Sequence, residues 1–71
     1  LADEAVANVD RYLDLTYGRN LGSVTIIHGK GTGVLRKAIA DYLRKNKKVA
    51  SFRTGAYGEG DTGVTVIELK G

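Results

Sequence analysis

Apolar residues recur at spacings of three and four in two stretches of the chain, and this spacing is typical of one face of an α-helix. The first stretch contains Ala2, Ala5, Val6, Val9, Tyr12 and Leu13, and the second contains Val34, Leu35, Ala38, Ile39, Tyr42 and Leu43. We therefore predict one helix over about residues 2–17, ending near Gly18, and a second helix that begins near Val34. Tyr12 and Tyr42 fall on the apolar faces, which predicts that both lie in the core.

Three shorter runs have the composition of β-strands. Val24–His28 is β-branched and apolar at nearly every position, which predicts a strand buried on both faces, as in a parallel sheet flanked by helices. Val49–Thr54 alternates partially, and Val64–Leu69 is a stronger strand candidate. Glycines at positions 55, 58, 60 and 63 indicate a long hairpin-type connection between those two strands. The expected order is helix, strand, helix, strand, strand, which is an α/β fold whose first helix lacks a preceding strand.

Length and composition bound the class of protein. The chain has 71 residues, no cysteine and no methionine. We expect one small domain, residues 1–71, and the lack of an initiator methionine predicts a fragment of a larger protein. Without cysteine there are no disulfides or thiolate metal ligands, which suits a reducing compartment. No run approaches the ~18 apolar residues of a membrane span, and no signal-peptide pattern opens the chain, so we expect a cytoplasmic protein without a membrane partner.

Positive charge is concentrated in the middle third of the chain. The formal net charge is +3 overall, but residues 30–53 carry +7 and each flanking segment carries −2. Arg36, Lys37 and Arg44 fall on the half of the second predicted helix that is opposite its apolar half. Such a focus of charge favours contacts with phosphates. The alternative is a basic helix surface that only keeps the protein in solution.

The segment "HGKGTG", residues 28–33, joins a predicted strand to a predicted helix. Unpaired amides and the dipole at a helix N-terminus favour an anion, glycines let it approach the backbone, and Lys30 adds a mobile charge. Thr32 is placed to cap the helix through its hydroxyl. The segment does not match a P-loop, because its lysine lies too early, or a dinucleotide fingerprint, because its third glycine comes one residue too soon. The KH-type spacing G-x-x-G at Gly60–Gly63 carries no positive charge.

His28 is the only histidine, and the sequence leaves two readings of it open. At the carboxyl end of a strand it would face the crevice where open α/β sheets bind ligands, as a general acid or base or as a phosphate contact. Alternatively, it only hydrogen-bonds and orders the loop. One histidine without cysteine does not make a metal cage, although carboxylates could hold Mg²⁺ or Mn²⁺ loosely. Glu59 and Asp61 are candidates for that, or are ordinary turn residues.

Two stretches together resemble one known family. "SVTIIHGKGTGVLRKAIADYLRKNKKVASFRTG" followed by "GEGDTGVTVIELK" is similar to the Smr (small MutS-related) domain, in the form found at the C-terminus of the second bacterial MutS paralogue. The resemblance covers nearly the whole chain. It implies a compact two-layer fold with two helices on a mixed four-stranded sheet. Its first strand, which carries an acidic leucine-aspartate-leucine-arginine-glycine motif, would precede this chain, and only Leu1 could belong to its edge.

The resemblance also implies an activity. Smr domains nick DNA, and some cleave RNA. The branch with the MutS paralogue is associated with branched DNA in recombination and repair, and with rescue of stalled ribosomes. In that branch an ATPase core forms a homodimer, so this domain itself would bind no nucleotide such as ATP. His28, Gly29, Gly31 and Gly33 match the family's H-G-x-G-x-G loop, with Lys30 and Thr32 between them.

Three functional hypotheses follow. In the first, the chain is an endonuclease module with His28 as its catalytic residue and no dedicated metal ligand. The residues expected to bind nucleic acid or phosphate are Gly29, Lys30, Gly31, Thr32, Gly33, Arg36, Lys37 and Arg44. The second is a non-catalytic module that binds nucleic acid or the ribosome. The third is a phosphate-binding or protein-interaction domain whose basic face only keeps it in solution. Phosphate contacts carry no base information, so the sequence does not distinguish DNA from RNA.

Overall fold

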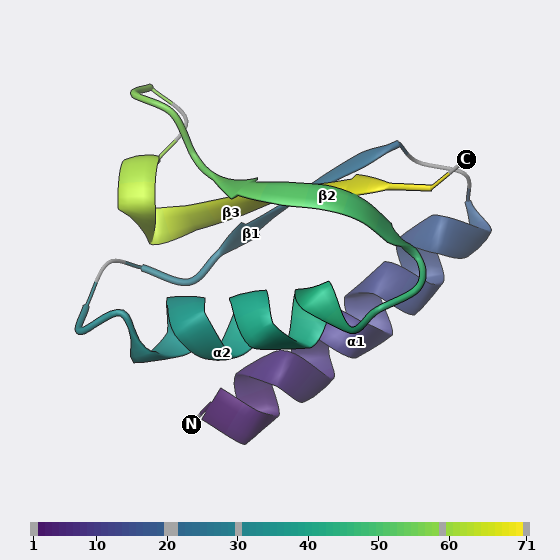
Figure 1. The fold of residues 1–71 in the computed structure, drawn as a ribbon, viewed down its shortest axis with the longest axis horizontal. Helices are drawn as coiled ribbons and strands as arrows, with labels where there is room; N and C mark the ends of the chain where they lie inside the picture. The colour runs from purple at the N-terminus through teal and green to yellow at the C-terminus, as the bar shows by residue number, and fades with distance from the viewer. Residues whose placement is uncertain (1, 20–21, 30, 59, 71) are drawn as a thin grey trace.

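The elements follow one another in the predicted order. The computed structural model describes residues 2–19, 22–29, 31–58 and 60–70. It contains helix α1 (Ala2–Gly18), strand β1 (Ser23–Ile27), helix α2 (Val34–Arg44), strand β2 (Val49–Thr54), a 3₁₀ turn η1 (Asp61–Gly63) and strand β3 (Val64–Leu69). Figure 1 shows the two helices side by side on one face of the sheet, which confirms the two-layer α/β arrangement. Neither described helix is long and apolar enough to cross a membrane.

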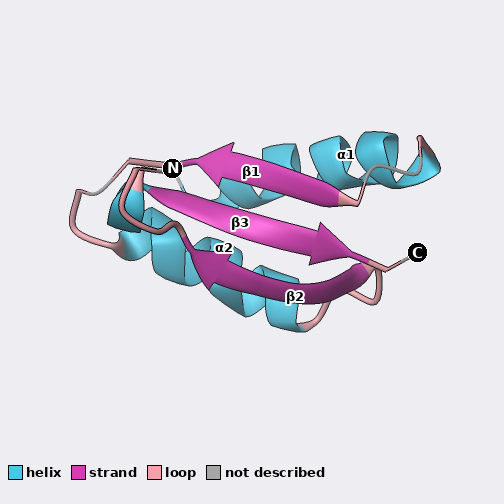
Figure 2. Cartoon of the chain, turned by 90° about the horizontal axis from the view of Figure 1, so that it is seen from above, coloured by secondary structure: helices cyan, strands magenta, loops and turns pink. Residues whose placement is uncertain are grey.

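The last strand in the chain is the central strand of the sheet. The order is β1-β3-β2, and β3 pairs antiparallel with both neighbours. Ile67 lies opposite Val24 of β1 and Phe52 of β2, and the β2 register shifts between Val49 and Ser51. β1 and β2 therefore run in the same direction on either side of β3, as the arrows in Figure 2 show.

The prediction for Val24–His28 is wrong in two respects, of which the first is that β1 pairs antiparallel with β3 and does not belong to a parallel sheet. The strand is also not buried on both faces, because β1 alternates: Val24 is buried, whereas Ile27 is 82% exposed. Helices cover only one face of the sheet, and β1 has a pairing partner only on its β3 side among the described strands. The strand that is buried at nearly every position is β3, which is exposed only at Glu68.

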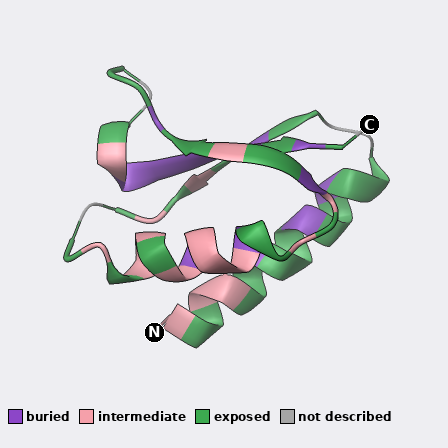
Figure 3. Cartoon of the chain, in the orientation of Figure 1, coloured by how far each residue is buried: buried purple, intermediate pink, exposed green. Residues whose placement is uncertain are grey.

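The core lies between the helices and the sheet. Figure 3 shows the buried positions on the sheet-facing sides of the helices and along β3. Leu13 of α1, Ile39 and Leu43 of α2 and Ile67 of β3 are almost completely buried. The remaining members of this cluster are Val9, Val24, Val49 and Leu69. The spacing of Val9 and Leu13, and of Ile39 and Leu43, places each pair on one helical face, so apolar burial against β3 holds both helices in position.

Tyr12 and Tyr42 depart from the prediction in different ways. Tyr12 is 48% exposed, because the next residue, Leu13, occupies the position that faces the core. Tyr42 does pack against the core, and its hydroxyl lies at the surface. That hydroxyl donates to the Asp10 carboxylate and accepts from Asn46 Nδ2 at 2.7 Å. Burial, and then the bond to Asp10, raise the pKa of Tyr42 to about 12.

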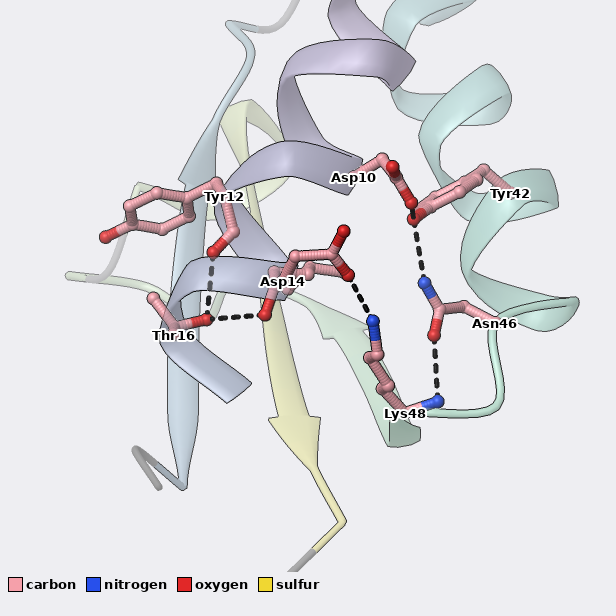
Figure 4. A network of polar contacts seen from close by, with 8 residues as sticks. Asp10, Tyr12, Asp14, Thr16, Tyr42, Asn46 and Lys48 are labelled. Carbon is pink, nitrogen blue, oxygen red and sulfur yellow. Dashed lines mark hydrogen bonds and ion pairs between the residues drawn. The ribbon is translucent and has the colours of Figure 1, made fainter. Parts of the chain in front are cut away.

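The same network continues to the start of β2. Asn46 Oδ1 accepts from the Lys48 amide at 2.8 Å, and the Lys48 ammonium pairs with Asp14, as Figure 4 shows. The side chains of α1 thus hold both α2 and the turn after it. Since this contact joins α1 to α2 at their polar edges, it complements the apolar packing beneath.

Replacing Tyr42 with Phe should lower the free energy of unfolding by about 1–2 kcal/mol at pH 7, because Asp10 and Asn46 lose their shared partner. The folded-state pKa of about 12 lies above the ordinary value of 10.0, so the unfolded chain loses this proton first as pH rises. The stabilisation is therefore complete below about pH 10 and is lost between pH 10 and 12.

Urea unfolding followed by circular dichroism measures the difference between wild type and Tyr42→Phe at several pH values. The difference in the free energy of unfolding should stay constant up to about pH 10 and then become smaller. Tyr57→Phe is the matched control, because the Tyr57 side chain is 100% exposed. Equal effects of the two substitutions would show that the Tyr42 hydroxyl does not stabilise the fold.

Candidate active site

The glycine segment forms the turn from β1 into α2. It lies at the same end of the molecule as the β2–β3 connection, as Figure 1 shows. Gly29, Gly31 and Gly33 all have positive φ, at 78°, 39° and 87°. At Gly33 a Cβ would also lie 3.2 Å from Arg36 Nη2, so the Arg36 side chain lies back against the loop. Glycine at position 33 therefore allows both the left-handed turn and the approach of a guanidinium group.

A small hollow of about 190 Å³ lies at the N-terminus of α2. Its walls contain most of the predicted site residues: His28, Gly29, Gly31, Thr32, Gly33 and Arg36, together with Val34 and Leu35. Lys30 is also a predicted phosphate contact but lies outside the described residues. We call this feature the loop hollow.

Thr32 does not occupy the predicted capping position. Gly33 is the N-cap residue of α2 and offers no side chain. The Thr32 hydroxyl oxygen instead accepts from the Val34 amide at 3.4 Å, a long hydrogen bond. Within the described ranges, no acceptor is found for the amides of Leu35 and Arg36. These first-turn amides and the helix dipole therefore make the loop hollow suitable for an anion.

One carbonyl group ties the glycine segment to the start of β3. The amides of His28 and Gly29 both donate to Gly63 O, at 3.0 and 2.9 Å. Gly63 ends η1 directly before β3, and the sequence predicted only a hairpin-type connection there. The Gly29 amide is therefore already paired, and the conformation of Gly29, rather than its N–H, shapes the loop.

The His28 ring is held at both nitrogens. Nδ1 lies 2.9 Å from Gly29 O, and Nε2 lies 2.9 Å from Thr65 Oγ1. A carbonyl oxygen can only accept, so Nδ1 carries the proton in the neutral ring. Nε2 is then unprotonated and accepts from the Thr65 hydroxyl. This assignment makes Nε2 the basic nitrogen of the site.

Sequence reasoning missed Thr65. It lies on the central strand, is only 4% exposed, and is 37 residues away from His28 in the sequence. Its position on β3 shares the helix-covered face with Ile67 and Leu69, because Thr65 lies opposite Ile26. A polar residue among the apolar positions of a strand was the available signal. The pairing with His28 depends on strand order, which the sequence does not give.

The predicted cations divide between two places. Arg36 borders the loop hollow, whereas Lys37 and Arg44 lie along a groove between α2 and β2. Asp41 lies between them, 3.3 Å from Lys37 Nζ and 2.7 Å from Arg44 Nη1. The hydrogen bond and the charge of Lys37, and then Arg44, lower the pKa of Asp41 below its ordinary value. Arg44 and Lys37 therefore share a carboxylate partner at helical spacing, which the charge pattern alone did not identify.

His28 also borders a third hollow, an apolar trough of about 550 Å³ lined by residues of α1, β1 and α2. Its walls include Tyr12, Ile26 and Leu35. The imidazole thus lies where the trough and the loop hollow meet.

The described residues do not assemble a metal cage. No group of three or more histidine, aspartate or glutamate side chains comes together in the part of the chain that the structure describes. Asp61 begins η1 with a φ of 56°, and Glu59 lies outside the described residues. The described residues therefore do not form a metal site by themselves.

Comparison with known proteins agrees with the resemblance in the sequence. The sequence profile of the Smr domain family matches residues 1–70. The endonuclease MutS2 of Clostridium beijerinckii is 63% identical over 70 residues, which are 99% of this chain and 9% of that protein. The endonuclease MutS2 of Caldicellulosiruptor bescii is 61% identical over 69 residues, 97% of this chain and 9% of that protein. The chain thus spans about 9% of the length of these relatives.

Two solved structures have the same fold. The crystal structure of the Smr domain of Thermus thermophilus MutS2 superposes with a TM-score of 0.98 and 42% identity, covering 100% of this chain and 89% of that chain. The stand-alone small MutS-related protein YdaL from Escherichia coli gives 0.92 and 23% identity, over 100% of this chain and 59% of that chain. Profile, sequence and structure agree, and this chain belongs to the Smr domain family.

Proposed function

We propose that this chain is an endonuclease module that hydrolyses phosphodiester bonds in nucleic acid. The observation that carries the proposal is the fixed orientation of His28, whose basic Nε2 is held by Thr65 while the ring borders a hollow suited to a phosphate. The names of the relatives support it, because the two MutS2 proteins compared above are endonucleases.

His28 acts as the general base in this proposal. Water forms a bond to phosphorus as its proton passes to Nε2. The bond from phosphorus to the leaving oxygen breaks, and that oxygen takes a proton from solvent. Nε2 has a single lone pair, so the Thr65 hydroxyl, which donates to it at rest, rotates away when Nε2 takes the water proton and afterwards accepts from the new Nε2–H. The Nδ1 bond to Gly29 O persists in both states and keeps the ring in one orientation.

The scissile phosphate binds in the loop hollow. The amides of Leu35 and Arg36, which have no acceptor among the described residues, and the helix dipole attract its charge, and the Arg36 guanidinium lies against the same loop. Lys30 adds a second cation in this proposal. Preorganised donors of this kind stabilise charge that develops on the phosphoryl oxygens in the transition state.

A loosely held Mg²⁺ or Mn²⁺ would supply charge neutralisation at the phosphate. The described carboxylates are not gathered to bind one, so no proton or bond in the step above is assigned to a metal.

The wider roles belong to the larger proteins in which such domains occur, and we propose them only in outline. The substrate would be DNA, including branched DNA in recombination and repair, or RNA, including RNA of stalled ribosomes. The full-length cytoplasmic protein would form a homodimer through an ATPase core.

One observation favours a second candidate, a module that binds nucleic acid or the ribosome without cleaving it. In the part of the chain that the structure describes, no carboxylate contacts His28, so a second acid–base group is missing from its surroundings. The same hollow would then bind phosphate without proton transfer.

Substituting His28 with Gln should lower the cleavage rate about 10²- to 10⁴-fold, because an amide forms hydrogen bonds but cannot exchange a proton at neutral pH. Nicking of supercoiled plasmid and cleavage of a labelled RNA measure this rate, each in Mg²⁺, in Mn²⁺ and in chelator. Phosphate binding should survive the substitution. Full activity of the His28→Gln protein would rule out His28 as the general base. A wild-type protein that binds nucleic acid without cleaving it would support the second candidate.

Thr65→Val should lower kcat about 10-fold or more while leaving KM nearly unchanged, since the hydroxyl orients His28 without contacting substrate. Single-turnover cleavage and equilibrium binding separate the two effects. Thr65→Ser retains the hydroxyl and should restore most of the rate. If the Thr65→Ser and Thr65→Val proteins are equally impaired, Thr65 contributes to packing in the sheet and does not orient His28.

A further inference from the structure

The groove between α2 and β2 is lined by side chains from the helix on one side and from the sheet on the other. Arg36, Lys37, Ala40, Asp41 and Arg44 line it from the helix, and Phe52, Arg53, Thr54 and Thr65 line it from the sheet. Its volume of about 470 Å³ falls within the ~300–1,000 Å³ that is usual for ligand sites. We call it the α2–β2 groove.

The charge of this groove is strongly positive. Among the residues that the structure describes, four cationic side chains, Arg36, Lys37, Arg44 and Arg53, line it together with one carboxylate, Asp41. Asp41 bonds two of the four and so holds them beside the groove. Arg53 lies on the opposite wall, where its Nη1 donates to Thr54 O at 3.3 Å. A polyanion would meet cations from both walls at once.

The groove also contains the only phenylalanine of the chain. Phe52 packs partly against the core, and the Arg44 guanidinium lies 5.8 Å from its ring centroid. A ring and a guanidinium plane are the two surfaces on which unpaired bases stack. An apolar surface with cations around it suits a nucleotide better than a simple anion.

The groove is continuous with the proposed reaction site. Arg36 borders both the α2–β2 groove and the loop hollow. Thr65 also lines the groove, and its hydroxyl contacts His28 Nε2 at 2.9 Å. A strand with one phosphate in the loop hollow therefore has its next nucleotide at the entrance of the groove.

We infer that the α2–β2 groove binds the unpaired nucleotide next to the scissile phosphate, with Phe52 and Arg44 as the base-stacking surface and Arg36 and Arg53 as backbone contacts. This inference rests on the proposed endonuclease function and adds a subsite to it. The ligand is a single-stranded stretch of nucleic acid, because a base inside a duplex cannot reach a side-chain ring without leaving its stack. Asp41 restrains this binding, since it competes with phosphate for Lys37 and Arg44.

Two substitutions in the groove test the inference in opposite directions. Asp41→Asn should tighten binding of a labelled single-stranded 12-mer about threefold at 50 mM salt, and should steepen the salt slope by about 0.7, because one more phosphate contact forms. Phe52→Leu should weaken binding of the same oligonucleotide about fivefold or more and leave duplex binding nearly unchanged. Fluorescence anisotropy measures both, with DNA and RNA of one sequence as parallel arms.

Each substitution has a matched control outside the groove. Glu68→Gln removes the same charge from the exposed position of β3, on the face of the sheet away from the helices. Tyr17→Leu removes an exposed aromatic ring from α1. Both should bind like wild type. Circular dichroism confirms folding of each variant, and the surface variant Asp41→Asn decides the matter if Phe52→Leu is unfolded.

The outcomes separate the subsite from the endonuclease function. If wild type cleaves but both groove variants bind like their controls, the subsite is wrong and the function stands. If the groove variants shift binding as expected while no substrate is cleaved under any metal condition, the subsite stands and the nuclease proposal fails. If wild type binds neither DNA nor RNA, both are wrong. Whichever oligonucleotide binds more tightly identifies the sugar that the groove accepts.

Discussion

The pairing of β3 with both other strands is the constraint on which this structure depends. β3 supplies Ile67 and Leu69 to the core beneath the helices. It also supplies Thr65, which holds the His28 ring, and it begins directly after Gly63, whose carbonyl accepts the amides of His28 and Gly29. Packing and site geometry thus share one element. A change that shifts the register of β3 by one residue would turn Thr65 away from His28 and expose Ile67.

Much of the fold could be predicted from local patterns. The first helix begins and ends within a residue of its predicted limits, and the second begins at its predicted residue, because three- and four-residue spacing is a property of the helix itself. The strands at residues 49–54 and 64–69 were also located correctly. Burial was harder to predict. The Val24–His28 segment has the composition of a central strand but lies at one side of the sheet, because strand order depends on contacts between residues far apart in the sequence.

In the candidate site, too, the local features could be predicted and the contacts between distant residues could not. The loop, its glycines and His28 could be singled out from sequence, since they lie within six residues of one another. The orientation of the imidazole could not, because Thr65 and Gly63 come from the other end of the chain. The charge distribution along the sequence predicted Lys37 and Arg44 as phosphate contacts without a partner, whereas Asp41 at helical spacing pairs with both. That pair could have been read from the i+4 and i+3 spacing, but its place beside Phe52 depends on the packing of α2 against β2.

The place of β3 in the chain has a consequence for the order of events in folding. β1 and β2 have no contact with each other in the described sheet order, so neither has a strand partner until residues 64–69 are available. Contacts between distant residues form late and cost chain entropy before they stabilise anything. During synthesis from the N-terminus, α1 and α2 can meet early, while His28 still lacks its partners. A nascent chain would therefore carry His28 without a fixed orientation of its ring. That orientation would form only when β3 inserts between β1 and β2.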